Sequence, residues 1–208
     1  LKKRLLTLAA LVEEQAKSSL FSFSKSDENL ANSVVERENE VDRLELELEE
    51  ECLKILALYQ PVATDLRFVV AALKITNDLE KIGGLAVHIA ERTIELVKRP
   101  ALRETLDLTE MSTKSIAMFR EALDSFINLD AQLARKVCAN DEAVNAIHAG
   151  NYVKVEKMLQ TLPDQAAVVI QLMSISRYLE RIADLATKIA EDVIYLVEGK
   201  MFRHRHSR

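Results

Sequence analysis

The sequence predicts an all-α protein made of two tandem antiparallel three-helix bundles, six helices in all, related by an internal duplication. The first reason is composition. The 208 residues include only four glycines and three prolines, against roughly 7% and 5% in average proteins, so long helices are favoured. The second is a repeat: residues 79–94 (LEKIGGLAVHIAERTI) return as residues 179–194 (LERIADLATKIAEDVI), with nine of sixteen positions identical. The third is that Pro61 and Pro163 interrupt the two halves at equivalent points.

The first half is expected to hold three helices. One covers residues 1–23, whose apolar side chains recur on one stripe, and residues 24–27 (SKSD) form a turn with capping side chains. The second helix covers residues 28–58 and ends before Pro61. The third follows that proline and continues to about residue 97. In the second helix the positions expected to face inward are Val34, Val41, Leu44, Leu48, Leu53 and Ile55.

The second half repeats this plan. Helices are expected over residues 108–129 and 130–159, and Pro163 then breaks the chain as Pro61 does in the first half. The last helix is expected over residues 164–198, with Gly199 as its stop signal.

The repeat divides the chain into a first three-helix bundle (1–100), a second (101–200) and a basic C-terminal tail (201–208). A unit of about 100 residues is large enough to bury a core of its own. The tail sequence FRHRHSR is interpreted either as a solvated end or as a contact for an acidic surface.

Charge and hydropathy exclude several classes of protein. The net charge is −5 and the basic residues are spread among acidic ones, which argues against nucleic acid as a partner. No apolar run approaches the roughly 20 residues that span a bilayer, and no secretory signal is visible. Cys52 and Cys138 are not arranged for metal binding. They are expected to be buried or half-buried thiols in a reducing cytoplasm.

Four pairs of positions, two in each half, have the four-residue spacing that places both side chains on one helix face. Six of these eight positions are acidic. Because the chain has 33 acidic residues, such pairs also arise on solvated faces, so a metal site and a plain acidic surface both stay open. Pairs that face each other across a groove would attract a cation, and carboxylate oxygens suit Mg²⁺, Mn²⁺, Ca²⁺ or iron. The pairs are Glu38 and Asp42, Glu80 and Gly84, Asp141 and Asn145, and Glu180 and Asp184.

The sequence shows few of the motifs that are typical of an enzyme. No histidine follows a glutamate at three residues, so the Glu-x-x-His signature of di-iron bundles is absent. There is no glycine-rich phosphate loop, and no set of residues suggests a catalytic triad. Gly83 and Gly84 fall inside an expected helix. Close approach of another helix is the favoured explanation, and an opened metal slot is the alternative.

Two long segments resemble the PhoU family of bacterial phosphate-signalling proteins. They are residues 60–83 (QPVATDLRFVVAALKITNDLEKIG) and residues 177–200 (RYLERIADLATKIAEDVIYLVEGK), and the resemblance covers essentially the whole chain. It implies a cytoplasmic, often dimeric, two-bundle regulator that touches the membrane only through its partners. Those partners would be the ATPase subunit of a phosphate ABC transporter and a sensor histidine kinase. Such proteins keep the phosphate-starvation response off when phosphate is plentiful.

The same resemblance implies multinuclear metal sites built from E/DxxxD motifs, without distinguishing Fe, Mn, Mg, Zn and Ni. Gly84 stands where the family usually has Asp, and Leu185 stands where a His is frequent. Weaker or fewer metals than in a full-motif relative are therefore expected, more so in the first bundle. The implied ligands are Glu38, Asp42 and Glu80 in the first bundle, and Asp141, Glu180 and Asp184 in the second, with Asn145 able to add an uncharged amide oxygen.

Three functions follow as alternatives. The first is a non-enzymatic adaptor and negative regulator of phosphate uptake. The second is a metalloenzyme or metal store that uses the duplicated carboxylates. The third is a purely structural dimerising bundle. Because the sequence shows no arginine cluster and no phosphate loop, direct phosphate sensing is expected only through a bound metal.

Overall fold

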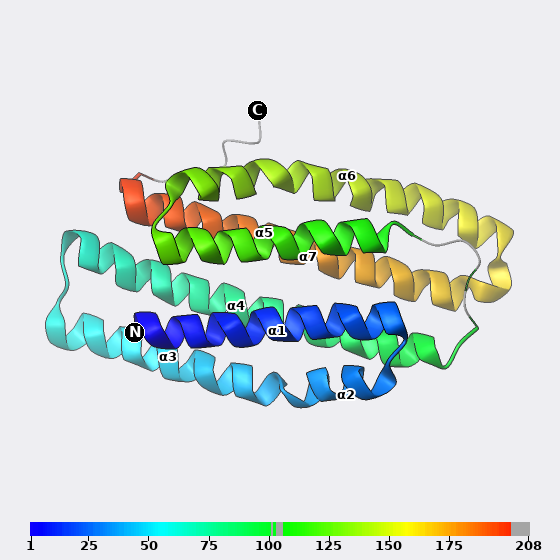
Figure 1. The fold of residues 1–208 in the computed structure, drawn as a ribbon, viewed down its shortest axis with the longest axis horizontal. Coiled ribbons are helices and arrows are strands. Elements are labelled where there is room, and N and C mark those ends of the chain that lie inside the picture. The colour runs from blue at the N-terminus through cyan, green and yellow to red at the C-terminus, as the bar shows by residue number, and fades with distance from the viewer. Residues whose placement is uncertain (101, 103–105, 201–208) are drawn as a thin grey trace.

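The computed structural model describes residues 1–100, 102 and 106–200, and these residues contain helices but no strand (Figure 1). This confirms the predicted all-α class. The predicted basic tail, residues 201–208, lies outside the described residues. The elements are α1 (Lys2–Lys25), α2 (Glu28–Glu36), α3 (Glu38–Tyr59), α4 (Ala63–Val97), α5 (Leu108–Asn128), α6 (Ala131–Thr161), the short 3₁₀ helix η1 (Pro163–Gln165) and α7 (Ala166–Glu198).

The helix expected over residues 28–58 is divided at Arg37 into α2 and α3. Arg37 keeps a near-helical conformation, with φ −81° and ψ −6°, and its N–H donates to the carbonyl of Val34 at 3.3 Å. The chain therefore makes one tight turn and continues as a helix. No glycine or proline marks this break, so the sequence pattern did not show it.

The duplication is visible in the backbone of the first turn of each half. Ser26 and Leu129 both adopt the left-handed conformation, with φ of 52° and 53°. The next residue in each case is an aspartate, Asp27 or Asp130, whose side chain caps the following helix. The N–H groups of both aspartates donate to a serine carbonyl five residues earlier at 2.9 Å. The two halves thus share turn geometry as well as sequence.

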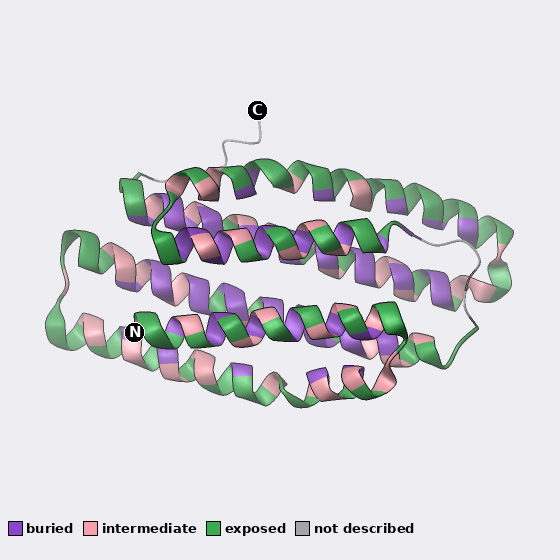
Figure 2. Cartoon of the chain, viewed as in Figure 1, coloured by how far each residue is buried: buried purple, intermediate pink, exposed green. Residues whose placement is uncertain are grey.

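The long helices α4 and α7 form the centre of the molecule, where the two halves pack against each other. In Figure 1 the first half lies below this contact and the second half above it, and Figure 2 shows the buried residues on the facing sides of the helices. Most of the expected inward positions are buried or half-buried, but Leu53 is 53% exposed, so that expectation is wrong. None of the described helices is long and apolar enough to cross a membrane.

Gly83 and Gly84 lie side by side in α4 in different surroundings. A Cβ atom on Gly83 would lie 3.2 Å from a methyl group of Val41 and 3.4 Å from Oε1 of Gln15. A Cβ atom on Gly84 would have nothing within 4 Å. Close helix approach therefore explains Gly83, as expected, but it does not explain Gly84.

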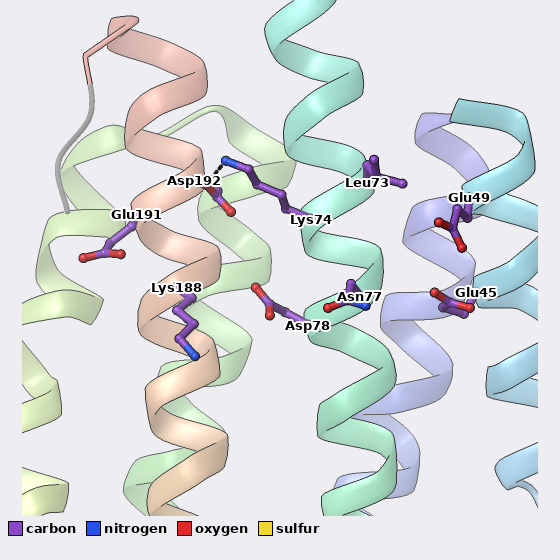
Figure 3. Close-up of a pocket in the computed structure, with 9 residues that line it drawn as sticks. All are labelled: Glu45, Glu49, Leu73, Lys74, Asn77, Asp78, Lys188, Glu191 and Asp192. Atoms are coloured by element: carbon purple, nitrogen blue, oxygen red, sulfur yellow. Dashed lines mark hydrogen bonds and ion pairs between the residues drawn. The ribbon is translucent and has the colours of Figure 1, made fainter. Parts of the chain in front are cut away.

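Polar contacts also join the two halves. The Lys74 ammonium on α4 donates to a carboxylate oxygen of Asp192 on α7 at 3.0 Å, and the Asp192 side chain is only 5% exposed. This pair lines a cavity of about 490 Å³ between the halves, which α3 borders with Glu45 and Glu49 (Figure 3). A few turns along the interface, Arg92 donates to the side chain of Gln171 at 3.1 Å.

Candidate carboxylate site

The first-bundle carboxylates come from the beginning of α3 and the middle of α4. Glu80 is half-buried, and burial raises its pKa; the carboxylates of Asp42 and Glu38 raise it further, against the opposing effect of Lys81. The packing of α3 on α4 therefore places Glu80 within electrostatic reach of Asp42 and Glu38. Gly84 contributes no oxygen to the group.

Glu45 also belongs to this acidic group, although the sequence analysis did not single it out. Its pKa is raised first by burial and then by Glu49, Glu80 and Asp42. Glu45 lies three residues after Asp42 and therefore shares a helix face with it. The i,i+3 spacing was the available signal, but the run of acids between residues 36 and 51 obscured it.

The second-bundle carboxylates come from α6 and α7. Burial raises the pKa of Glu180, and Asp141 raises it further, while Arg181 and Arg177 act in the opposite direction. Burial also raises the pKa of Asp184 to about 6, with Glu180 and Asp141 adding to the shift and Lys188 and Arg181 opposing it. Three predicted acids again converge, and this bundle keeps the aspartate that Gly84 replaces in the first.

The remaining predicted position, Asn145, serves another carboxylate. Its amide donates to one oxygen of Asp141 at 3.0 Å, and the Thr187 hydroxyl donates to the other oxygen at 3.3 Å. Both oxygens of Asp141 are thus hydrogen-bonded, and the Asn145 oxygen belongs to a side chain on the exposed part of α6.

The two acidic groups lie where the sequence predicts metal ligands. Within residues 1–100, 102 and 106–200, no three His, Cys, Asp or Glu side chains form a group arranged to hold a metal ion. The carboxylates approach one another closely enough to repel, yet they do not form a ready ligand set. The seven predicted ligands therefore stay a prediction.

Two histidines lie close to these groups. His88 is about half exposed; it contacts Glu91 at 3.3 Å and packs against the Tyr178 ring with centroids 5.4 Å apart. His148 was not singled out by the sequence, and its Nδ1 lies 2.9 Å from the hydroxyl of Ser176. Burial lowers its pKa. Ser176 is fully buried, so this contact is part of the packing between α6 and α7.

The two cysteines are buried, as expected. Burial raises the pKa of Cys52, and it raises the pKa of Cys138 to about 11. Both thiols therefore stay protonated near neutral pH, which makes them poor nucleophiles and poor metal ligands.

Comparisons with known proteins agree with the duplication. The PhoU domain family matches this chain twice, over residues 5–93 and 108–193. A phosphate-specific transport system accessory protein PhoU homolog of Aquifex aeolicus (strain VF5) is 35% identical over 207 residues, covering 99% of this chain and 93% of that protein. The crystal structure of PhoU from Pseudomonas aeruginosa superposes with a TM-score of 0.93 at 33% identity, over 96% of each chain. The phosphate transport system regulatory protein PhoU from Streptococcus pneumoniae has a TM-score of 0.86 at 26% identity, over 98% of this chain and 96% of that one.

Proposed function

The chain belongs to the PhoU family, and from this membership we propose that it is an accessory protein that regulates phosphate transport. The observation that carries the proposal is the double match: each half contains a PhoU domain, and the whole chain superposes on a PhoU crystal structure. We propose further that the protein acts in the cytoplasm as a negative regulator. It would restrain phosphate uptake and the phosphate-starvation response when phosphate is plentiful.

We propose that regulation works by contact, with the protein acting as an adaptor between the ATPase subunit of a phosphate ABC transporter and a sensor histidine kinase. The α3–α4 turn and the α6–α7 turn present different side chains, which supports the proposal of two different partners. At the α3–α4 turn, Leu58, Tyr59 and Val62 are 75%, 77% and 74% exposed. The equivalent residues of the second half are Gln160, Thr161 and Asp164. Clustered exposed apolar side chains are typical of protein contacts, and only the first half carries them at this turn.

A homodimer and bound metal ions are further parts of the proposal. The support for metal binding is the mutual repulsion of Glu180, Asp184 and Asp141, which a divalent or trivalent cation would relieve. The second bundle would bind the ion more tightly, because Asn145 offers an amide oxygen where Gly84 of the first bundle offers no oxygen. Metal analysis of the purified protein and of the Asp184→Asn variant tests this, and light scattering of the same samples tests the dimer.

The regulatory proposal is tested with a phosphate-starvation reporter in phosphate-rich medium. The host strain lacks this gene and carries the wild type, Glu180→Ala plus Asp184→Ala, or the exposed control Glu142→Ala plus Glu156→Ala. Deletion is expected to switch the reporter on, and both the wild type and the control are expected to silence it. A silent reporter in the deletion strain would contradict the negative-regulator proposal. Failure of only the Glu180 and Asp184 variant, at normal protein level, would place these carboxylates in the signalling mechanism.

A further inference from the structure

A second cavity lies between the two halves, where equivalent parts of α4 and α7 face each other. Its volume is about 500 Å³, and α4 and α7 line it with side chains at equivalent positions of the repeat. Leu85 and Leu185 are one such pair, and both are buried. Because α4 and α7 carry the repeated sixteen-residue stretch, each cationic position contributed by one helix has a counterpart on the other.

The lining is rich in cations. Lys81 and Arg181 are repeat equivalents, and Lys188 is the equivalent of His88; all four line the cavity. Arg181 and Lys188 lie close enough to Asp184 to act on it electrostatically, but neither forms an ion pair with Asp184 within the described part of the chain. In Figure 3 the Lys188 side chain extends along α7 away from Asp192. These cationic groups converge only in the folded chain, because Lys81 and Arg181 are 100 residues apart in the sequence.

Gly84 decides the charge balance of this cavity. Its equivalent in the second half is Asp184, so an aspartate at position 84 would place another carboxylate in the lining. Glycine inside a helix is destabilising relative to alanine, and at Gly84 no close packing accounts for it, because a Cβ atom would have nothing within 4 Å. With glycine present, the lining holds Lys81, Arg181 and Lys188 beside two carboxylates, Glu80 and Asp184. Lys81 also lies 4.0 Å from the carboxylate of Asp78, which is outside the lining. Gly84 thus weakens a cation site and favours an anion site.

We propose that this cavity binds a phosphate group, either as free orthophosphate or as part of a phosphorylated small molecule. The planar guanidinium of Arg181 suits two-pronged hydrogen bonding to phosphate oxygens, while Lys81 and Lys188 add point charges. The cavity is far larger than the roughly 30 Å³ of one water molecule, and Tyr178, Leu85 and Leu185 provide surface for an ester group. The inference rests on the proposed function, since it gives a phosphate-responsive regulator a place for its effector.

Position 84 provides a matched test. Gly84→Asp and Gly84→Asn add side chains of the same shape into open space, and they differ in charge. Isothermal titration of the chelator-treated full chain is carried out with orthophosphate, pyrophosphate and AMP. The wild type is expected to bind at least one of these with one site per chain, and Gly84→Asn is expected to bind it similarly. Gly84→Asp is expected to bind the probe about tenfold more weakly. The added carboxylate repels the phosphate, and two like charges about 10 Å apart give an effect of this size at an effective dielectric constant of about 20.

A second pair of variants shows whether the cations themselves hold the ligand. Arg181→Gln plus Lys188→Gln is expected to abolish binding, whereas the exposed control Arg43→Gln plus Lys54→Gln on α3 is expected to leave it unchanged. Circular dichroism establishes that each variant is folded. Orthophosphate binding more tightly than AMP would identify the free ion as the ligand, and the reverse order would identify an ester.

Three results would overturn the proposal. They are absence of saturable binding of all three probes, equal affinities of Gly84→Asp and Gly84→Asn, and binding that requires added metal. The regulatory role is measured separately by the reporter. A chain that silences the reporter but binds no probe keeps the proposed function and loses this site, whereas a chain that binds a probe but regulates nothing keeps the site and loses the function.

Discussion

The two halves of the molecule share a scaffold and differ at their functional positions. The turns after α1 and α5 each have a residue in the left-handed conformation followed by a capping aspartate, and the leucines at positions 85 and 185 are both buried. At position 84, however, the first half has open space, and the second has Asp184 with a pKa raised to about 6. The duplication therefore kept what folds each bundle, while the charges that face the shared cavity became unequal.

The largest effect is expected where the halves are most alike. Leu79 and Leu179 are repeat equivalents, and both are fully buried. Replacing either with alanine removes buried methyl groups and leaves a cavity, so each variant is expected to lose about 2–5 kcal/mol of stability. Urea unfolding measures both. If one variant unfolds like the wild type while the other loses several kcal/mol, the two cores do not contribute equally, and the comparison of scaffolds fails.

The junction between the halves is expected to be nearly as sensitive. Asp192 is buried and accepts a hydrogen bond from Lys74 across the interface. Asp192→Asn removes the negative charge from this buried contact and should lower the stability of the protein by about 1–3 kcal/mol. The matched control on the same helix is Glu198→Gln. The carboxylate of Glu198 lies 2.6 Å from the guanidinium of Arg135, and the Arg135 side chain is 39% exposed. An exposed pair contributes at most about 1 kcal/mol. Equal losses in thermal or urea unfolding would show that burial of the junction pair is unimportant.

The unequal charges predict a pH-dependent difference between the halves. The pKa of Asp184 is raised from 3.8 to about 6. Between these two pH values the carboxyl of Asp184 is therefore protonated in the folded chain and ionised in the unfolded chain. Stability contributed by this group is therefore present at low pH and lost as the pH rises through about 6. In chelator-treated protein, Asp184→Asn should raise stability by about 1–2 kcal/mol at pH 8, after a discount for partial exposure.

The control for this prediction is Gly84→Asn, which places the same amide in the first half. The stability difference between Asp184→Asn and the wild type should vanish below about pH 4, whereas any difference between Gly84→Asn and the wild type should not change across this range. Urea unfolding at several pH values measures both. A pH-independent gain for Asp184→Asn would mean that the charge of Asp184 is not the cause.

Local patterns in the sequence predicted most of the fold, because helix periodicity, capping residues and prolines act over a few residues. The sequence patterns failed where contacts between distant parts of the chain determine the structure. Leu53 fits the apolar stripe of α3 but is exposed, and Arg37 interrupts a helix without a breaker residue. The predicted carboxylates do converge within each bundle, but the packing of α4 against α7 was not readable. The grouping of Lys81 with Arg181 and Lys188 therefore escaped the sequence analysis, which expected phosphate sensing only through a metal.

The smallest expected effect tests the turns that the two halves share. Asp130 accepts hydrogen bonds from the N–H groups of Gln132 and Leu133 at 2.9 and 3.0 Å, whereas Asp27 accepts one, from Leu30 at 3.0 Å. Loss of a capping side chain costs about 0.5–2 kcal/mol. Asp130→Ala should therefore fall in the upper part of that range and Asp27→Ala in the lower part.

Asparagine variants at the same positions separate capping from charge, since Asn caps a helix about as well as Asp. Asp130→Asn and Asp27→Asn should both unfold at urea concentrations close to that of the wild type. If Asp27→Ala costs more than Asp130→Ala, the second hydrogen bond of Asp130 contributes nothing to capping. The short helix α2, which follows Asp27 and has nine residues, would then depend on its cap more than the 31-residue helix α6 does, because a short helix has fewer internal hydrogen bonds to hold its first turn.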